Sequence, residues 1–158
     1  MAEAVFRQPA EGGTRSHPFG GDVAFKVRGE QSSGAMTAFE TVVAPGEGPP
    51  LHTHANEEET LYVLDGEVRF KLGDELVRGS SGSFAFVPRG LPHTFQNVGD
   101  GPLRMLIHFS PSGMERFFDA FAAMEAPGPE AFAAAAAPAG MEVVGPPLAA
   151  DGASDSAG

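Results

Sequence analysis

The feature that most constrains the fold is a succession of short β-forming segments, each closed by glycine, proline or aspartate turn residues. Between Val23 and Phe109 they recur at a spacing of roughly 8–12 residues, which is typical of β-sandwiches and β-barrels. Asp65-Gly66 separates two of them and is a strong hairpin signal. The expected strands are Val23–Arg28, Met36–Val43, Thr60–Leu64, Glu67–Leu72, Glu75–Arg78, Ser83–Val87, His93–Asn97 and Leu103–Ser110. The chain is therefore predicted to be all-β.

Length and composition agree with one domain. The 158 residues include 13 phenylalanines, and 42% of the chain is hydrophobic, which is enough for a folded core. Glycine (21 residues) and proline (14 residues) make up more than a fifth of the chain without a fixed period, as expected where turns join many short strands. No internal repeat indicates a second barrel.

The chain divides into four predicted stretches. Residues 1–18 are polar and rich in glycine and proline, so they are expected to form an irregular lead-in. Residues 19–112 form the predicted barrel and residues 113–148 a helical extension. The small, polar residues 149–158 are expected to be a disordered tail.

The helical extension is predicted from a change of periodicity after Gly113. In Met114–Met124 the apolar side chains recur at spacings of three and four, which indicates an amphipathic helix with Ser112 as its N-cap. Pro129–Ala137 is alanine-rich and begins with proline, so a second helix is expected there.

Charge and composition exclude several classes of protein. The formal charge of −11 disfavours binding to nucleic acid or to anionic membranes. Cysteine is absent, so any bound metal must use nitrogen and oxygen ligands. The N-terminus has no apolar signal segment, and no apolar run approaches the ~20 residues of a membrane helix. A soluble, cytoplasmic protein is the expectation.

The first block of chemically suited residues lies between Gly46 and Gly66. Five residues separate Gly46 from His52-Thr53-His54, four more lead to Glu59, and six lead on to Gly66. Residues two apart in a strand point to the same face, so His52 and His54 can present both imidazoles to one point. After a turn, the carboxylate of Glu59 can face back toward that point.

The second block begins 15 residues after the first, at Gly82. Pro88 follows after five residues, Gly90 after one more, His93 after two and Asn97 after three. The His93 ring would come from a later strand. Three imidazoles and one carboxylate suit a divalent transition metal (Fe, Mn, Ni, Co, Cu or Zn), and on an octahedral ion they leave open positions for substrate, water or dioxygen.

These two blocks match the two motifs of the cupin superfamily, and the chain resembles compact bacterial members with a single barrel over about residues 19–124. The resemblance implies a double-stranded β-helix, or jelly-roll, barrel whose metal ligands fall on His52, His54, Glu59 and His93. Glu58 is the competing carboxylate, but the spacing from Glu59 to Gly66 is the one that the family pattern uses.

A finer resemblance is to small cupins similar to quercetin dioxygenase. It implies a dioxygenase that acts on an aromatic or enolic, flavonol-like substrate, with dioxygen as the second substrate. Glu59 would then be the catalytic base that removes the hydroxyl proton. The segments that carry this resemblance are Gly48–His52, Tyr62–Glu67, Phe86–Gly90, Phe109–Pro111, Gly113–Phe118 and Val143–Leu148.

Apolar residues that alternate with the ligands predict an apolar substrate pocket. Leu61 and Val63 follow Glu59 at spacings of two, and Phe95 follows His93. Arg69 and Lys71 are expected to point outward, so the pocket fits a planar aromatic molecule rather than a sugar phosphate. Further candidates, which core packing explains better than a place in the pocket does, are Phe39, Phe70, Phe84, Phe86, Met105 and Phe109.

Other functions stay open. A cyclase or isomerase of a polyketide-like substrate would use the metal as a Lewis acid without consuming dioxygen. A non-catalytic cupin that binds a small molecule is the third class. A homodimer is also open, because the family often pairs through its sheets.

Overall fold

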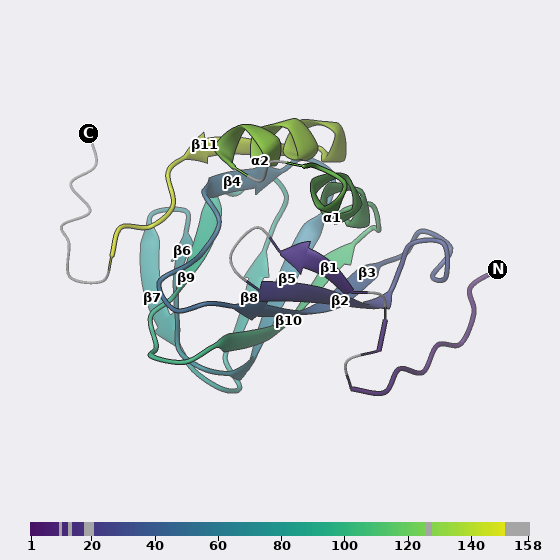
Figure 1. Ribbon diagram of the computed structural model, residues 1–158, viewed down its shortest axis with the longest axis horizontal. Coiled ribbons are helices and arrows are strands. Elements are labelled where there is room, and N and C mark those ends of the chain that lie inside the picture. The colour runs from purple at the N-terminus through teal and green to yellow at the C-terminus, as the bar shows by residue number, and fades with distance from the viewer. Residues whose placement is uncertain (10, 13, 18–20, 126–127, 151–158) are drawn as a thin grey trace.

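The computed structural model describes residues 1–9, 11–12, 14–17, 21–125 and 128–150. Within these residues, strands form two antiparallel sheets, and two short helices lie together at one end (Figure 1). The six-stranded sheet has the order β1-β2-β3-β10-β5-β8, and the five-stranded sheet has the order β11-β4-β9-β6-β7. The predicted all-β double-stranded β-helix is therefore confirmed.

Most strands lie where the turn residues predict them. The strands are β1 (Thr14–His17), β2 (Gly21–Val27), β3 (Thr37–Val43), β4 (Leu51–His54), β5 (Glu58–Asp65), β6 (Val68–Leu72), β7 (Glu75–Gly79), β8 (Phe84–Val87), β9 (His93–Asn97), β10 (Leu103–Ser110) and β11 (Met141–Gly145). The helices are α1 (Glu115–Ala122), α2 (Pro129–Ala136) and a 3₁₀ turn, η1 (Ala137–Ala139).

The core lies between the two sheets, and strand alternation builds it. On β10 the side chains of Leu103, Met105, Ile107 and Phe109 are buried, whereas Arg104 between them is exposed. Because β10 pairs with β3 on one side and β5 on the other, it is a central strand of the first sheet. Its buried side chains therefore form the middle of the core.

The Asp65-Gly66 turn is not a hairpin, contrary to the prediction. Strand β5 belongs to the first sheet and β6 to the second, so the chain crosses between sheets at this turn. Gly66 has a φ of +101°, and a Cβ there would lie 2.9 Å from the carbonyl oxygen of Pro102. The hairpin instead joins β6 to β7 through Gly73-Asp74, with Leu72 opposite Glu75.

Both ends of the chain contribute strands that the predicted boundaries leave out. Within the predicted irregular lead-in, β1 pairs with β2, so this part of the prediction is wrong. Within the predicted helical extension, β11 pairs with β4 and places Met141 opposite His54. Both are edge strands whose backbone pairing, rather than an alternating apolar pattern, fixes their conformation.

The two predicted helices are present, but the predicted N-cap of the first is wrong. The N-cap of α1 is Met114, which makes no side-chain capping bond. Instead, the carboxylate of Glu115 accepts hydrogen bonds from the backbone N–H groups of Gly29 and Gly113 and from the hydroxyl of Thr37. No helix among the described residues is long and apolar enough to cross a membrane.

The segment that follows β11 lies against the second sheet at Gln96 and Arg69. Arg69, which is predicted to point outward, is buried there. Its guanidinium donates hydrogen bonds to the carbonyl oxygen of Ala149 at 2.6 Å and to Oε1 of Gln96 at 3.0 Å. Ala149, the first residue of the predicted disordered tail, is therefore held against the sheet, and residues 151–158 of that tail lie outside the described residues.

Candidate metal centre

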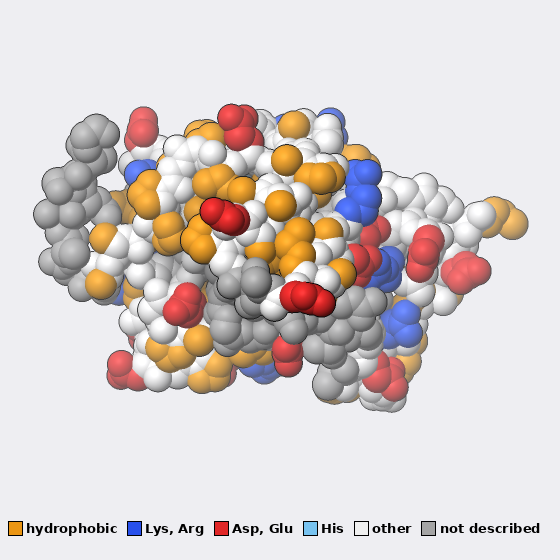
Figure 2. Space-filling view, turned by 45° about the horizontal axis from the view of Figure 1, so that its top comes forward, with side chains coloured by type: hydrophobic (Ala, Val, Ile, Leu, Met, Phe, Trp, Pro, Cys, Tyr) orange, Lys and Arg blue, Asp and Glu red, His pale blue; other side chains and the backbone are white. Residues whose placement is uncertain are grey.

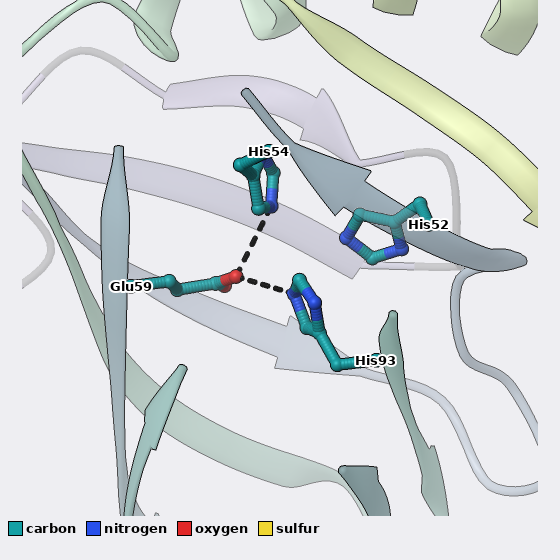
Figure 3. Close-up of side chains that lie close together, drawn as sticks. All are labelled: His52, His54, Glu59 and His93. Atoms are coloured by element: carbon teal, nitrogen blue, oxygen red, sulfur yellow. Dashed lines mark hydrogen bonds and ion pairs between the residues drawn. The ribbon is translucent and has the colours of Figure 1, made fainter. Parts of the chain in front are cut away.

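The four predicted ligand residues converge between the two sheets (Figure 3). His52 and His54 lie on β4 and His93 on its neighbour β9, whereas Glu59 reaches toward them from β5 in the opposite sheet. All four side chains are buried. One ligand atom from each lies within 4.8 Å of the others, which is close enough for one ion to contact all four.

Because side chains alternate between the two faces of a strand, these residues point toward the site and their neighbours do not. On β4, Thr53 is half-buried between the two buried histidines, as expected for residues that alternate between faces. On β5, Glu59 points inward, whereas Glu58 forms an ion pair with Arg89 at 3.0 Å. The structure thus separates the two competing carboxylates, because Glu58 lies on the other side of the strand from the histidines.

Backbone carbonyls fix the orientation of two of the rings. Nδ1 of His52 lies 2.7 Å from the carbonyl oxygen of Pro50, and Nδ1 of His93 lies 2.9 Å from that of Leu91. A carbonyl can only accept, so each Nδ1 carries the proton and donates it. Nε2 of each ring therefore faces the centre of the site, as is typical of histidines that bind metal.

Glu59 is ionised in this arrangement. Its Oε2 lies 2.8 Å from Nε2 of His93 and 3.1 Å from Nε2 of His54. Burial opposes ionisation, but the hydrogen bonds and charges of the two imidazoles outweigh it and hold the pKa of Glu59 well below its ordinary value. The same hydrogen bond to Glu59 raises the pKa of His93 against the effect of burial.

The polar atoms fit a divalent transition metal. Burial, together with the charges of His93 and His54, lowers the pKa of His52 to about 3, so its ring is neutral and can offer a lone pair. Nδ1 of His54 is buried without a hydrogen bond among the described residues, and its Nε2 lies 3.1 Å from Oε2 of Glu59. A metal held by His52, His54, Glu59 and His93 would bind Nε2 of His54 in place of this contact.

The segment before β4 holds His52 in place. A Cβ on Gly48 would lie 1.9 Å from the carbonyl oxygen of Phe95, so only glycine allows this backbone to run so close to β9. Next to it, the carbonyl oxygen of Pro49 accepts a hydrogen bond from the hydroxyl of Thr94 at 2.6 Å. The sequence Gly48-Pro49-Pro50 thus fastens the start of β4 to β9, the strand that carries His93.

Asn97, the last residue of the second block, has a structural role. Its buried amide donates hydrogen bonds to the carbonyl oxygens of Val43 and Gly101 at 2.9 and 2.8 Å, and its Oδ1 accepts one from the N–H of Gly99 at 2.9 Å. The end of β9 is therefore joined to the end of β3 and to the turn before β10.

A small cavity of about 40 Å³ lies against the ligands. By volume it has room for about three water molecules or for a molecule such as dioxygen. Of the residues predicted for the substrate pocket, Phe39 and Phe95 line this cavity, as does Phe109. Leu61, Val63 and Met105 do not line it and lie in the core, whereas Phe84 and Phe86 are exposed, contrary to their predicted place inside the barrel.

Sequence reasoning missed the lining that comes from beyond the barrel. The C-terminal elements and the residues just before α1 contribute Met114, Phe117, Phe118, Phe132 and Met141. The periodicity of α1 predicts that its phenylalanines are buried, but no sequence signal indicates that they face the ligands. Glu57 was also missed: it is buried, burial raises its pKa, and its Oε2 has no hydrogen-bond partner among the described residues.

Comparisons with known sequences agree with this geometry. A family model described as "Cupin domain" matches residues 39–109. The polyketide synthase protein CurC of Streptomyces cyaneus is 34% identical over 80 residues, which cover 49% of this chain and 52% of CurC. Protein SchB of Streptomyces halstedii is 33% identical over 94 residues, covering 58% of this chain and 67% of SchB. Quercetin 2,3-dioxygenase of Bacillus subtilis is 35% identical over 81 residues, covering 49% of this chain and 23% of that enzyme.

The chain spans about half the length of the curated polyketide synthase relatives that it matches. Among solved structures, a predicted oxalate decarboxylase from Thermotoga maritima superposes with a TM-score of 0.59. The superposition covers 69% of this chain and 99% of that one, at 24% sequence identity. At this identity the likeness supports the fold alone.

Proposed function

Since the chain belongs to the cupin superfamily, we propose that it is an enzyme whose metal, held by His52, His54, Glu59 and His93, acts on an aromatic substrate with an enolic or phenolic hydroxyl. The observation that carries this proposal is the convergence of four buried ligand residues beside an apolar cavity. A binding protein without turnover would not need an ionised carboxylate among three imidazoles at the end of such a cavity.

The first candidate reaction is dioxygenation of a flavonol-like substrate. A divalent transition metal would supply a Lewis acid and a template for the substrate oxygen. Glu59 is ionised and can accept the hydroxyl proton of the substrate. The phenylalanine side chains of the lining exclude water from the electron-rich anion that results, and the cavity of about 40 Å³ has room for dioxygen. The similarity to quercetin 2,3-dioxygenase supports this candidate.

The second candidate is a cyclase or isomerase of a polyketide-like substrate. It is favoured by the similarity to the polyketide synthase protein CurC. Glu59 would again remove a proton, but the anion would attack within the same molecule and no dioxygen would be consumed.

Metal analysis followed by oxygen measurement tests the proposal. The purified protein is stripped with a chelator, loaded in turn with Fe, Mn, Co, Ni, Cu or Zn, and mixed with flavonols and catechols in an oxygen electrode. Oxygen uptake that depends on the metal supports the dioxygenase. Anaerobic conversion of the same substrates, or of poly-β-ketone analogues, without a gain of oxygen mass supports the second candidate.

Glu59→Gln should abolish turnover in both assays, because the proposed proton acceptor is lost. Glu58→Gln is its matched control, because the two residues are neighbours and only Glu59 faces the ligands. Absence of metal at one ion per chain would overturn the proposed site. Metal binding without any turnover would overturn the proposed enzyme.

A further inference from the structure

An apolar groove of about 530 Å³ lies outside the barrel, next to the two helices. Its walls come from α1, α2, β11 and the segment before β4. The face that carries these elements shows a broad group of hydrophobic side chains in Figure 2. The groove is lined by, among others, Gly48, Pro50, Phe121, Phe132, Ala133 and Val143.

Phe132 connects this groove with the metal centre. Its side chain is buried and lines both the outer groove and the cavity beside the ligands. It packs edge-to-face against Phe117, with 4.9 Å between ring centroids. Phe132 therefore lies between the two spaces.

The two volumes differ in what they can hold. The cavity beside the ligands, at about 40 Å³, is too small for an aromatic ring system. The outer groove, at about 530 Å³, lies within the range of roughly 300–1,000 Å³ that is typical of sites for small molecules. An aromatic substrate can therefore be accommodated in the groove before any part of it reaches the ligands.

The lining indicates the chemical class of the molecule. Among the residues that the structure describes, those around the groove are apolar or glycine, apart from the exposed Glu47, and none is a lysine or arginine. A phosphate or carboxylate group would find no cationic partner there, and the net charge of −11 would repel it. The groove suits an uncharged, planar, fused-ring molecule.

We infer that the outer groove binds the ring system of an uncharged fused-ring substrate, and that its enolic end reaches the ligands when the Phe132 side chain moves aside. This inference rests on the proposed function for the identity of the reacting end. Phe132 is then a specificity-determining residue, because the opening that it leaves sets the width of substrate that can approach Glu59.

Two alanines on α2 provide a matched test of the groove. Ala133 lines it and Ala134 does not, yet both are exposed, so a larger side chain is tolerated by the fold at either position. The probes are quercetin and 1,8-dihydroxyanthraquinone, titrated calorimetrically into the metal-free protein. Ala133→Phe should weaken binding about tenfold or more, and Ala134→Phe should change it by less than about twofold. Equal affinities for wild type and Ala133→Phe would overturn the inference.

Phe132→Leu tests the connection to the metal. With Co²⁺ bound, the visible absorption of the ion reports whether a probe reaches it. We expect the absorption change on addition of 1,8-dihydroxyanthraquinone to be faster in Phe132→Leu than in wild type, with Co²⁺ content unchanged. An unchanged rate would show that Phe132 does not control access.

These outcomes are separate from those of the proposed function. If Ala133→Phe loses probe binding but the wild type turns over no enolic substrate, the groove is a binding site and the proposed enzymatic activity is contradicted. If the wild type shows metal-dependent turnover that Ala133→Phe leaves unchanged, the activity is supported and the proposed role of the groove is contradicted.

Discussion

Oε2 of Glu59 lies 2.8 Å from Nε2 of His93, although the two residues belong to opposite sheets. The bond joins β5 of the first sheet to β9 of the second across the inside of the barrel. The distance between the ligands is therefore set by the separation of the two sheets. A metal bound there would join the sheets as well as serve the reaction.

The first prediction is that the metal is bound by the carboxylate of Glu59 and not by that of Glu58. Glu59→Gln removes the charge at nearly constant shape and should lower metal affinity by at least about tenfold, since even changes outside the ligand shell often cost that much. Glu58→Gln should bind metal as wild type does, because Glu58 pairs with Arg89 instead. Competition with a chromophoric chelator measures both affinities. Equal losses in the two variants would contradict the assignment of Glu59.

The second prediction concerns stabilisation by the metal. The four ligand side chains are buried and lie close together only in the folded chain, so an ion held there binds the folded state and not the unfolded one. At free metal about 100 times the dissociation constant, linkage stabilises the folded state by about 2.7 kcal/mol. For a chain of this length the melting temperature should rise by roughly 5–10 °C.

Scanning calorimetry with Zn²⁺ or Ni²⁺ measures that shift, and Mg²⁺ is the control because it prefers oxygen ligands. His52→Ala should reduce the shift. A rise of equal size with Mg²⁺ would point to a general ionic effect on an acidic protein and not to this site.

The third prediction concerns the approach of the Gly48 segment to β9. Gly48→Ala places a Cβ 1.9 Å from the carbonyl oxygen of Phe95 and should destabilise the fold by about 1–3 kcal/mol. Metal occupancy should fall too, because this segment positions the Pro50 carbonyl that holds His52. Gly101→Ala is the control, since a Cβ there meets nothing within 4 Å. Similar melting temperatures for both variants would contradict the steric argument.

Two of the ligands could be predicted from local geometry. His52 and His54 are two apart on one strand, so alternation alone places them on one face. Glu59 and His93 lie on other strands, and the resemblance to the cupin motifs identifies them. The crossing at Gly66 could not be predicted, because an Asp-Gly turn that joins two sheets has the same residues as one that closes a hairpin. The place of Phe132 could not be predicted either. An alanine-rich helix carries little information about which surface it packs on, and only tertiary packing brings that ring next to the ligand cavity.

The fourth prediction concerns the pH dependence of stability at Glu115. Burial opposes its ionisation, but hydrogen bonds from Thr37 and from backbone N–H groups outweigh this and lower its pKa in the folded state. A carboxyl with a lowered pKa contributes stability above its unfolded pKa, and this contribution is lost as the pH falls toward the folded pKa. Glu115→Gln should therefore cost about 1–3 kcal/mol at pH 7, and this difference should shrink as the pH falls below about 4.5.

Urea unfolding at a series of pH values measures the effect at Glu115. Glu130→Gln is the control, because Glu130 lies in the first turn of α2 and is exposed. A cost for Glu115→Gln that stays constant down to pH 3 would show that the charge of Glu115 is not what its hydrogen bonds stabilise.

The fifth prediction concerns Asn97, where a change of one atom removes two hydrogen bonds. Asn97→Asp keeps the shape, and Oδ1 can still accept from the N–H of Gly99. The second oxygen, however, would face the carbonyl oxygens of Val43 and Gly101, to which the amide now donates. Buried acceptors without donors are costly, so we expect a loss of roughly 2–5 kcal/mol in the free energy of unfolding.

The same substitution at an exposed asparagine separates this loss from the effect of one more negative charge. Asn56→Asp adds the same charge at an exposed position, and it should cost less than about 0.5 kcal/mol. Chemical denaturation at pH 7 measures both variants. If general repulsion in an acidic chain were the cause, the two losses would be alike and both would diminish in high salt. If the hydrogen bonds of Asn97 are the cause, its loss persists in salt, because buried contacts are screened little.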